Sequence, residues 1–264
     1  MESSLYFKTA LILSSQLGII FAGCFFLISS AKRAYKDGRT FFGIEFIGRK
    51  NSRGELDLIP IEQPPIITTK KTGSPRVPKP INPAENKAQP ATALFTKFIW
   101  VWLISLFGMV FLAAKSTAIG LTLMTISSIT FAPLLGVIML EMDENDGLRA
   151  TLLTCLITVG AALIGMYSGI DFSFIRGFLF CALCLLLLVG FWRMFFGMTS
   201  AAIRAKAICG AILFSLFLVY DFNRLKQLSD IGINDWSTAL DMAISIYLDI
   251  LNLLLEIMQA MGNS

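Results

Sequence analysis

The sequence predicts an all-α fold, that of a polytopic membrane protein with seven transmembrane helices. Of its 264 residues, 55% are hydrophobic and only 15% are charged, and the mean hydropathy is +0.71, a balance far from that of a soluble domain. Crossing about 30 Å of hydrocarbon takes roughly 17 to 25 apolar residues. Windows of this kind lie near residues 9–30, 98–114, 116–140, 150–170, 177–192, 207–220 and 239–258.

The first window is too long for the apolar core of a signal peptide, which spans about 7 to 15 residues, and no small-residue cleavage site clearly follows it. We therefore predict that residues 1–30 form a transmembrane helix that stays in the protein. Residues 98–264 are predicted to form a six-helix membrane core. These features indicate a multi-pass protein of a bacterial inner membrane or an organelle membrane, embedded in the lipid bilayer.

The sixth window, 207–220, is short and ends at Asp221. We expect it to extend by about a turn at either end, because long basic side chains can reach from a helix end to the membrane interface. The side chains expected to do so are those of Arg204, Lys206 and Arg224.

One soluble segment, residues 31–97, interrupts the helices and holds most of the prolines and more than half of the Lys and Arg residues. Its first half contains two partly alternating apolar runs around the turn-rich "RKNSRG", which predicts a β-hairpin. Its second half, "PPIITTKKTGSPRVPKPINPAENKAQP", is too rich in proline for helix or central strand and predicts an extended linker. This basic loop either binds an anionic lipid surface or a membrane-protein partner, or is a solvated tether.

Basic side chains predict the orientation. One group follows the first helix: Lys32, Arg33, Lys36 and Arg39. A second group lies between the fifth and sixth windows, on the same side of the membrane: Arg193, Arg204 and Lys206. Cytoplasmic loops are enriched in Lys and Arg, so this count places residues 31–97 in the cytoplasm and the N-terminus outside.

The last apolar segment, "DMAISIYLDILNLLLEIMQ" at 241–259, carries acids inside a membrane helix. A carboxylate at the bilayer centre costs roughly 2.5 to 3.5 kcal/mol on insertion scales. Helical spacing of three and four residues places its polar side chains on one face. That polar stripe consists of Asp241, Ser245, Asp249, Asn252 and Glu256. We expect the stripe to turn inward and the last helix to be central.

Asp221 and Asp249 are predicted to approach each other, because a short connection makes the last two helices antiparallel neighbours. Two carboxyls in a site with few waters share one proton, which makes a pH-sensing switch. Their oxygens are also suitable transient ligands for Ca²⁺, with Asn252 and Glu256 further along the ion pathway. The alternatives are that Asp221 only pairs with Arg224 and that Asp249 only clasps a neighbouring helix.

Other features indicate packing more than chemistry. Gly165 and Gly169 form a small-x-x-x-small pair, which favours close helix packing. The acidic run Glu141, Asp143, Glu144 and Asp146 is interpreted as a solvated turn. No catalytic constellation, phosphate-binding loop or cofactor motif is evident, and nothing indicates nucleic-acid binding. The sequence therefore predicts a protein that is not an enzyme.

Three stretches resemble the Bax inhibitor 1 family of TMBIM-type membrane proteins: "GIDFSFIRGFLF" at 169–180, "LVYDFNRL" at the end of the sixth window, and "ISIYLDILNLLLEIM" in the last helix. The resemblance covers residues 98–258. It implies seven helices, six of them around the last, and a pH-sensitive Ca²⁺ leak gated by two aspartates, which by motif are Asp221 and Asp249. It also implies a cytoplasmic N-terminus, against the charge count.

The sequence departs from this family pattern in two ways. Some members pair the aspartates with an arginine in the second helix, but residues 98–114 contain no Arg or Lys, which leaves only Lys97 or Lys115 to reach in. The long basic loop is also unusual. Two functions follow: a pH-sensitive Ca²⁺ leak channel, and a non-conducting regulator that binds other membrane proteins, such as a quality-control protease. The missing arginine favours the second, and a proton-coupled transporter is third.

Overall fold

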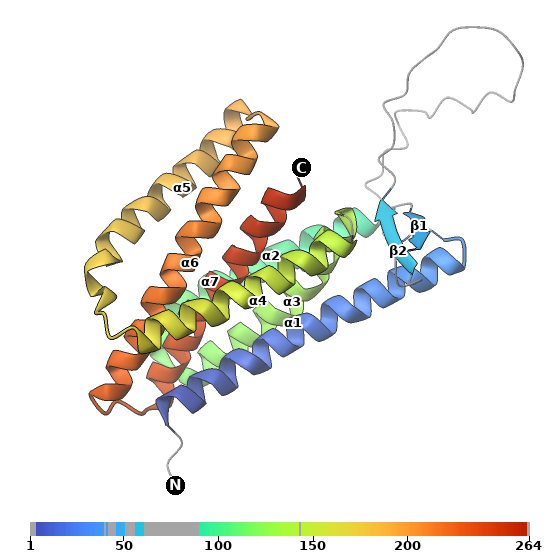
Figure 1. Cartoon of the computed structure of the whole chain (residues 1–264). Helices are drawn as coiled ribbons and strands as arrows, with labels where there is room; N and C mark the ends of the chain where they lie inside the picture. Colours follow the sequence, from blue (N-terminus) through green and yellow to red (C-terminus); the bar gives the residue numbers. More distant parts are fainter. Residues whose placement is uncertain are drawn as a thin grey trace, which may run out of the picture.

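The computed structural model describes residues 4–39, 41, 46–50, 56–60, 90–142 and 144–262. In this part of the chain, the long elements are helices α1 (Leu5–Lys36), α2 (Pro90–Leu112), α3 (Thr117–Glu141), α4 (Glu144–Tyr167), α5 (Arg176–Phe196), α6 (Ser200–Asp230) and α7 (Trp236–Gly262). Strands β1 (Phe46–Lys50) and β2 (Leu56–Pro60) form a hairpin, and the 3-10 turns η2 (Ala113–Lys115) and η3 (Phe172–Ile175) precede α3 and α5. The predicted helical fold is thus present (Figure 1).

Six helices are long and apolar enough to cross a membrane: α1, α3, α4, α5, α6 and α7. The described apolar part of α2, Thr96–Leu112, is shorter. Large apolar side chains cover the outside of the bundle, and on α5 Phe178, Leu185 and Phe195 are each more than 60% exposed. An apolar surface of this extent requires a lipid environment. The protein is therefore a multi-pass integral membrane protein, as predicted.

The interior is formed mainly by α3 and α7, the two most buried of the long helices. Helix α7 packs against α1, α3, α4 and α6, and Ile246, Tyr247 and Leu253 are fully buried. The apolar faces of α7 are therefore enclosed by protein. The six other helices do not form an even ring around it, because α5 lies outermost and packs mainly against α6 (Figure 1).

The hairpin predicted in the first half of the long loop is present. Its strands pair antiparallel, with Phe46 opposite Pro60 and Lys50 opposite Leu56. The Tyr35 hydroxyl near the end of α1 accepts a hydrogen bond from the backbone N–H of Gly48 at 3.0 Å. The hairpin packs on the ends of α1 and α3 through a small apolar cluster of Leu27, Ala31, Phe46, Leu58, Val137 and Leu140. Residues 64–89 of the predicted linker lie outside the described residues, as does Asp143 of the acidic run, and the last linker residue, Pro90, begins α2.

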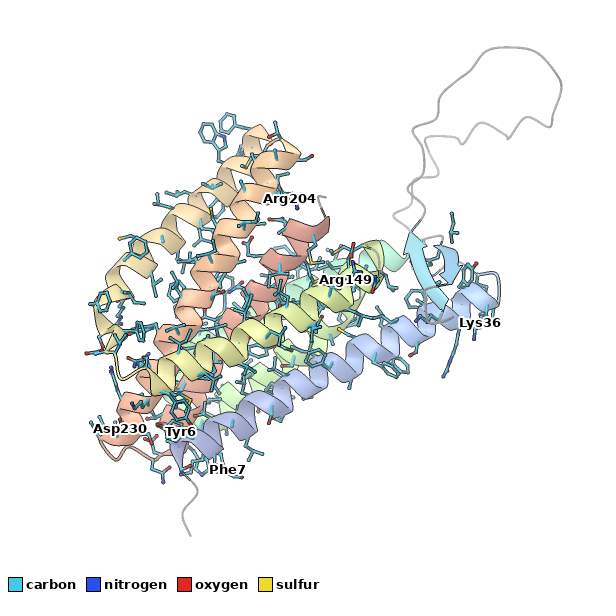
Figure 2. All side chains as sticks on the ribbon, in the orientation of Figure 1. Tyr6, Phe7, Lys36, Arg149, Arg204 and Asp230 are labelled. Carbon is cyan, nitrogen blue, oxygen red and sulfur yellow. The ribbon has the colours of Figure 1, made fainter. Side chains whose placement is uncertain are left out.

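Successive turns alternate between two ends of the bundle. One, the N-terminal end, holds the start of α1 and the turns that follow α4 and α6; Figure 2 shows Tyr6, Phe7 and Asp230 there. The other, the hairpin end, holds the hairpin, the turn between α5 and α6, and the end of α7; Lys36 and Arg204 lie toward it (Figure 2).

Two helices extend further than the sequence predicted. Helix α1 continues to Lys36, where Gly38 takes a φ of +66° that favours glycine. Helix α6 has 31 residues and runs from Ser200 to Asp230, so Asp221 lies within it and does not end it. Polar residues after Asp221 bond to the turn between α4 and α5, which explains why the helix continues past the apolar window.

Candidate functional site: a carboxyl pair between the last two helices

Asp221 of α6 and Asp249 of α7 meet inside the bundle. Residues 231–235 connect the two helices, which makes them antiparallel neighbours, and the two carboxyl side chains lie close enough to interact with each other. Asp221 is 5% exposed and Asp249 is half-buried. Because ionised carboxylates only accept hydrogen bonds, a direct hydrogen bond between the two would need a proton on one of them. The structure brings together the two residues that the sequence predicted to approach, while their role in proton or ion movement stays a prediction.

Arg224 provides the positive charge near this pair. It lies three residues after Asp221 on α6, is exposed, and interacts electrostatically with both Asp221 and Asp241. Within the described residues no ion pair of 4.0 Å or less joins Arg224 to Asp221. The predicted alternative, in which Asp221 serves only to pair with Arg224, therefore does not describe its surroundings, because Asp249 also lies close to Asp221.

Asn223, two residues after Asp221, anchors α6 to the end of α4. Its Nδ2 donates to the backbone carbonyls of Gly165 at 3.1 Å and Ile170 at 2.9 Å. Its Oδ1 accepts from the backbone N–H of Phe172 at 3.1 Å and from Gln227 Nε2 at 2.9 Å. Because a buried amide with its donors and acceptor all paired has one favourable orientation, this network fixes the position of α6 beside Asp221.

Asp171 extends the same network outside the membrane-spanning helices. Its carboxylate accepts from the backbone N–H of Ser173 at 2.9 Å and from Gln227 Nε2 at 2.7 Å. Hydrogen bonds from the Ser173 side chain and backbone, and then from Gln227, hold the pKa of Asp171 below its usual value. Asp171 is therefore ionised throughout the neutral pH range and stabilises the turn between α4 and α5.

Gly165 lets the backbones of α4 and α6 approach closely. A Cβ at this position would lie 2.5 Å from the carbonyl oxygen of Val219 and 3.0 Å from the backbone nitrogen of Asn223, on either side of Asp221. The predicted packing role of Gly165 is thus present. Gly169 has a different role, because it lies in a turn with φ +72° and open space around its Cα.

The rest of the polar stripe is enclosed to different degrees. Asp241 is exposed, Ser245 and Asn252 are half-buried, and Glu256 is buried. We had predicted that the whole stripe turns inward, and this is wrong for its start. Asp241 lies at the surface near the N-terminal end, and the stripe enters the protein from Ser245 onward. The opposite side of α7 is held in place by Tyr247, whose hydroxyl bonds to Ser128 of α3 at 3.0 Å.

Glu256 forms an ion pair with Lys206 of α6 near the hairpin end. The sequence predicted that Lys206 would reach toward the membrane interface but not that it would have this partner; its position relative to the interface stays a prediction. The side chains of Lys206 and Glu256 are only 19% and 10% exposed. A hydrogen bond between an ammonium group and a carboxylate is stronger than one between neutral groups, and it stabilises the Lys206 side chain here. The local sequence pattern does not show that Glu256 is its neighbour.

The order of motifs and the carboxyl pair can now be compared with known proteins. A family model described as inhibitor of apoptosis-promoting Bax1 matches residues 66–264, well over half of the chain. The chain belongs to this Bax inhibitor family. The resemblance that the sequence motifs indicated is therefore confirmed.

Relatives of this Bax inhibitor family chain occur in bacteria and plants. A Vibrio cholerae protein described as an uncharacterized membrane protein is 29% identical over 110 residues, which are 42% of this chain and 46% of that protein. A Helicobacter pylori protein described as uncharacterized is 26% identical over 176 residues, 63% of this chain and 72% of that protein. Protein LIFEGUARD 4 of Arabidopsis thaliana is 29% identical over 114 residues, 42% and 44% respectively. The chain thus spans less than half the length of the Vibrio and Arabidopsis relatives.

The basic group near the aspartates differs from what the family resemblance implied. Lys97 and Lys115 are both exposed, and neither is among the groups that interact with Asp221 or Asp249. Arg224, from α6 itself, lies near the pair instead. In this Bax inhibitor family chain, the positive charge beside the aspartates therefore comes from the neighbouring turn of the same helix.

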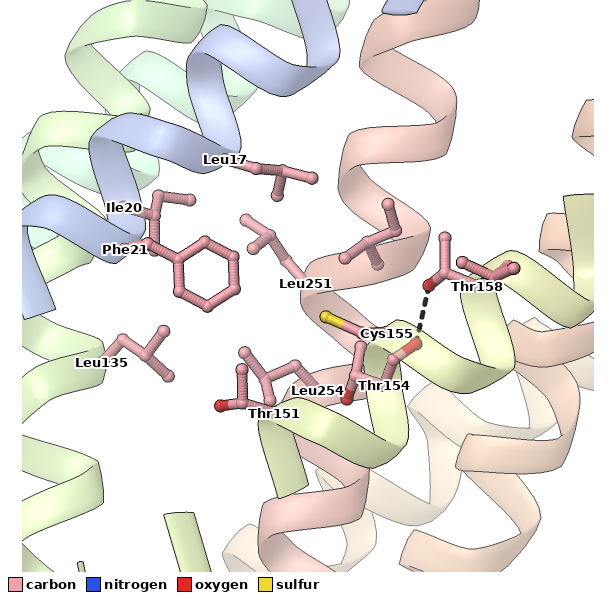
Figure 3. Close-up of a pocket in the computed structure, with 12 residues that line it drawn as sticks. Leu17, Ile20, Phe21, Leu135, Thr151, Thr154, Cys155, Thr158, Leu251 and Leu254 are labelled. Carbon is pink, nitrogen blue, oxygen red and sulfur yellow. Dashed lines mark hydrogen bonds between the residues drawn. The ribbon is translucent and has the colours of Figure 1, made fainter. Parts of the chain in front are cut away.

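A separate cavity of about 170 Å³ lies between α1 and α4, with α7 behind it (Figure 3). Its lining residues carry no charge, and the hydroxyls of Thr154 and Thr158 donate to carbonyls of their own helix at 2.8 Å. Leu251 and Leu254 of α7 close its inner side (Figure 3). This apolar space is suited to hydrocarbon and not to ions, so it is not part of the carboxyl site.

Sequence reasoning missed three residues that position this site: Asn223, Gln227 and Lys206. Asn223 stands two residues after Asp221 in the quoted "LVYDFNRL". Because the sixth helix was expected to extend past Asp221, a polar residue in that extension could have indicated a contact with another segment. Lys206 had no such signal, because its partner lies 50 residues away.

Proposed function

We propose that this protein is a pH-sensitive, Ca²⁺-permeable leak channel in which Asp221 and Asp249 form the gate. The observation that carries the proposal is the close approach of two carboxyl groups on neighbouring membrane helices. Asp249 stands near the middle of α7, where a carboxylate is costly to keep without a function.

The gate has two states that differ by one proton. With one carboxyl protonated, the pair shares a short hydrogen bond that holds α6 and α7 together. When both are ionised, they repel each other, and Arg224 is the nearby cation that favours the ionised form. Separation of the two helices then opens the polar stripe. Cation flux should therefore rise as the pH rises through the titration of the pair.

Ca²⁺ is the cation that the carboxylates suit, because it prefers carboxylate, carbonyl and water oxygens. Within the described residues no group of three or more acids or cysteines is arranged to hold a metal ion. Two carboxylates alone favour a transient contact during passage. Asn252 and Glu256, further along α7, are the next oxygen-bearing side chains on that path.

The test is Ca²⁺ uptake into liposomes that contain the purified protein, measured at several pH values. Asp221→Asn and Asp249→Asn preserve shape and hydrogen bonding but remove the titration, so each should flatten the pH profile without preventing folding. Asp230→Asn, at the exposed end of α6, is the matched control and should keep the wild-type profile. Wild-type pH dependence in both pair variants would exclude the gate.

The channel proposal includes seven membrane crossings, with α2 as the second. Because α1 crosses once, it places the N-terminus and the hairpin on opposite sides of the membrane, and the charge count puts the hairpin in the cytoplasm. A cysteine introduced at Ser74 tests this with a membrane-impermeant thiol reagent on intact cells, because the five native cysteines lie within apolar helices. Labelling from outside would refute the charge argument.

A second candidate function is a non-conducting regulator that binds another membrane protein through the long loop. The hairpin supports it, because it is anchored on α1 and α3 and belongs to the same long loop. Deleting residues 61–89 should leave the helices folded, since loop closure depends only weakly on length. Loss of a partner recovered by crosslinking, with unchanged Ca²⁺ uptake, would favour this function. Loss of membrane insertion would show that the segment is structural.

A further inference from the structure

Lys206 and Glu256 form a second charged site, away from the aspartate pair. They join α6 to α7 near the hairpin end as an ion pair whose side chains are mostly buried. Gly210, one turn after Lys206, makes room for the carboxylate, because a Cβ there would lie 2.6 Å from Glu256 Cδ. The close approach of the two helices therefore leaves a recess that the Glu256 carboxylate fills.

Glu256 has acceptor capacity that the ion pair does not use. Its Oε1 contacts Lys206, whereas its Oε2 is buried and has no hydrogen-bond partner within the described part of the chain. Buried polar atoms in folded proteins are nearly always paired, with protein or with water. The unpaired oxygen therefore marks a position where a further positively charged or hydrogen-bonding group fits.

A cavity that Glu256 helps to line lies at the ends of α3, α6 and α7. Its polar lining consists of Lys206, Glu256 and Gln259. On α7, Gln259, Glu256, Asn252 and Asp249 follow one another at spacings of three and four residues, which places them on one helical face. The cavity therefore lies at the hairpin end of the polar stripe, with Asp249 seven residues away, roughly 10 Å along the axis.

Two positive charges face the single carboxylate at this end. Lys206 pairs with Glu256 directly, and Arg193 of α5 interacts with it electrostatically. Arg193 and Lys206 also line a second cavity together, between α5 and α6. A cation that approaches Glu256 through either cavity therefore passes the charge of Lys206.

We propose that Glu256 is a cation-binding position at the hairpin end of the polar stripe, and that Lys206 is a tethered cation which occupies it and limits the access of inorganic cations to the aspartate pair. The effect on flux rests on the proposed channel function. The occupation of the Glu256 site by Lys206 does not.

Two single variants give opposite expected effects on flux. Lys206→Met removes the tethered cation, and Ca²⁺ uptake should rise on the order of tenfold, the effect of one unit charge at about 10 Å in a partly buried site. Glu256→Gln leaves Lys206 uncompensated, and uptake should fall by a similar factor. The double variant restores the net charge of the site and should return toward wild-type uptake. Arg204→Gln, exposed on the same helix, should change uptake less than twofold.

The direction of the change in uptake distinguishes two roles of the Lys206–Glu256 pair. Either it controls the access of cations, or it only holds α6 against α7. If the ion pair only fastens the helices, both single variants loosen the bundle and change uptake in the same direction. Equal directions, or no change in either variant, would overturn the proposal.

A measurement without conduction keeps the proposal testable if the protein does not pass Ca²⁺. In Glu256→Cys, the new thiol is modified by a cationic and by an anionic methanethiosulfonate, and the peptide that contains it is quantified by mass spectrometry. Adding Lys206→Met should raise the ratio of cationic to anionic rates about tenfold. An unchanged ratio would show that Lys206 does not control cation access. Failure of uptake in the wild type, with a changed ratio, would reject only the channel function.

Discussion

Asp221 and Asp249 bring their carboxyl groups close together across two helices that are joined by residues 231–235. The pair is central to the molecule, because α7 is packed against α1, α3, α4 and α6. A change in the separation of the two carboxyls therefore requires α6 and α7 to move against each other.

Arg224→Gln should shift the pH dependence of Ca²⁺ uptake toward higher pH. Arg224 interacts with Asp221 and Asp241, and a nearby positive charge favours ionised carboxylates. Without it, the pair keeps its shared proton to a higher pH, by roughly half to one pH unit. Arg149→Gln, exposed at the other end of the bundle, should leave the curve in place. A shift toward lower pH would contradict the assigned role of Arg224.

Asn223→Ala should destabilise the protein by about 2 to 4 kcal/mol, because it leaves the buried carbonyl of Gly165 and the N–H of Phe172 without their partner. The midpoint of thermal unfolding in detergent is the measurement. Ser215→Ala on the same helix is the control, since that hydroxyl bonds only to the carbonyl of Ala211 in its own helix at 2.7 Å. Equal effects of both substitutions would show that the Asn223 network contributes little.

Gly165→Ala should force α4 and α6 apart beside Asp221. The added methyl group would lie 2.5 Å from the Val219 carbonyl oxygen and 2.9 Å from the Phe222 Cβ, and overpacking of this kind costs about 1 to 3 kcal/mol. Gly160→Ala, five residues earlier on the same helix, has nothing within 4 Å of the new Cβ and should be neutral or slightly stabilising. Thermal unfolding of the two variants side by side gives the comparison.

Acidification should weaken the turn between α4 and α5 only well below neutral pH. The pKa of Asp171 is lowered in the folded protein by Ser173 and Gln227, so its contribution to stability is present above the unfolded pKa of about 4 and is lost as the pH falls through the lower folded pKa. The difference in unfolding temperature between wild type and Asp171→Asn should therefore be constant from pH 5 to pH 8 and shrink below about pH 4.

That result also separates Asp171 from the gate. If Ca²⁺ uptake changes between pH 5 and pH 8, Asp171 cannot be the group that titrates, because it stays ionised over this range. Asp171→Asn should accordingly keep the wild-type pH profile of uptake. A flattened profile in this variant would assign the pH dependence to the turn instead of the aspartate pair.

Local patterns sufficed for the elements whose signals are contained in a short stretch. The apolar windows predicted the helices, and the alternation around "RKNSRG" predicted the hairpin, because helix length and strand pairing depend on neighbouring residues. Windows were less reliable at helix ends. Helix α6 extends to Asp230 because Asn223 and Gln227 bond to a turn about 50 residues away, and no hydropathy window contains that information.

The sequence by itself determined that the chain crosses a membrane and that acids follow one face of its last helix, because hydropathy and helical spacing are properties of consecutive residues. The short connection between the last two helices also predicted that Asp221 and Asp249 approach each other. Tertiary structure alone decided which basic groups accompany these acids. It put Arg224 near the aspartate pair instead of a basic residue from α2, and buried Lys206 against Glu256. The physical reason is that a buried charge is stable only beside a partner, and partners on different helices are chosen by how the helices pack.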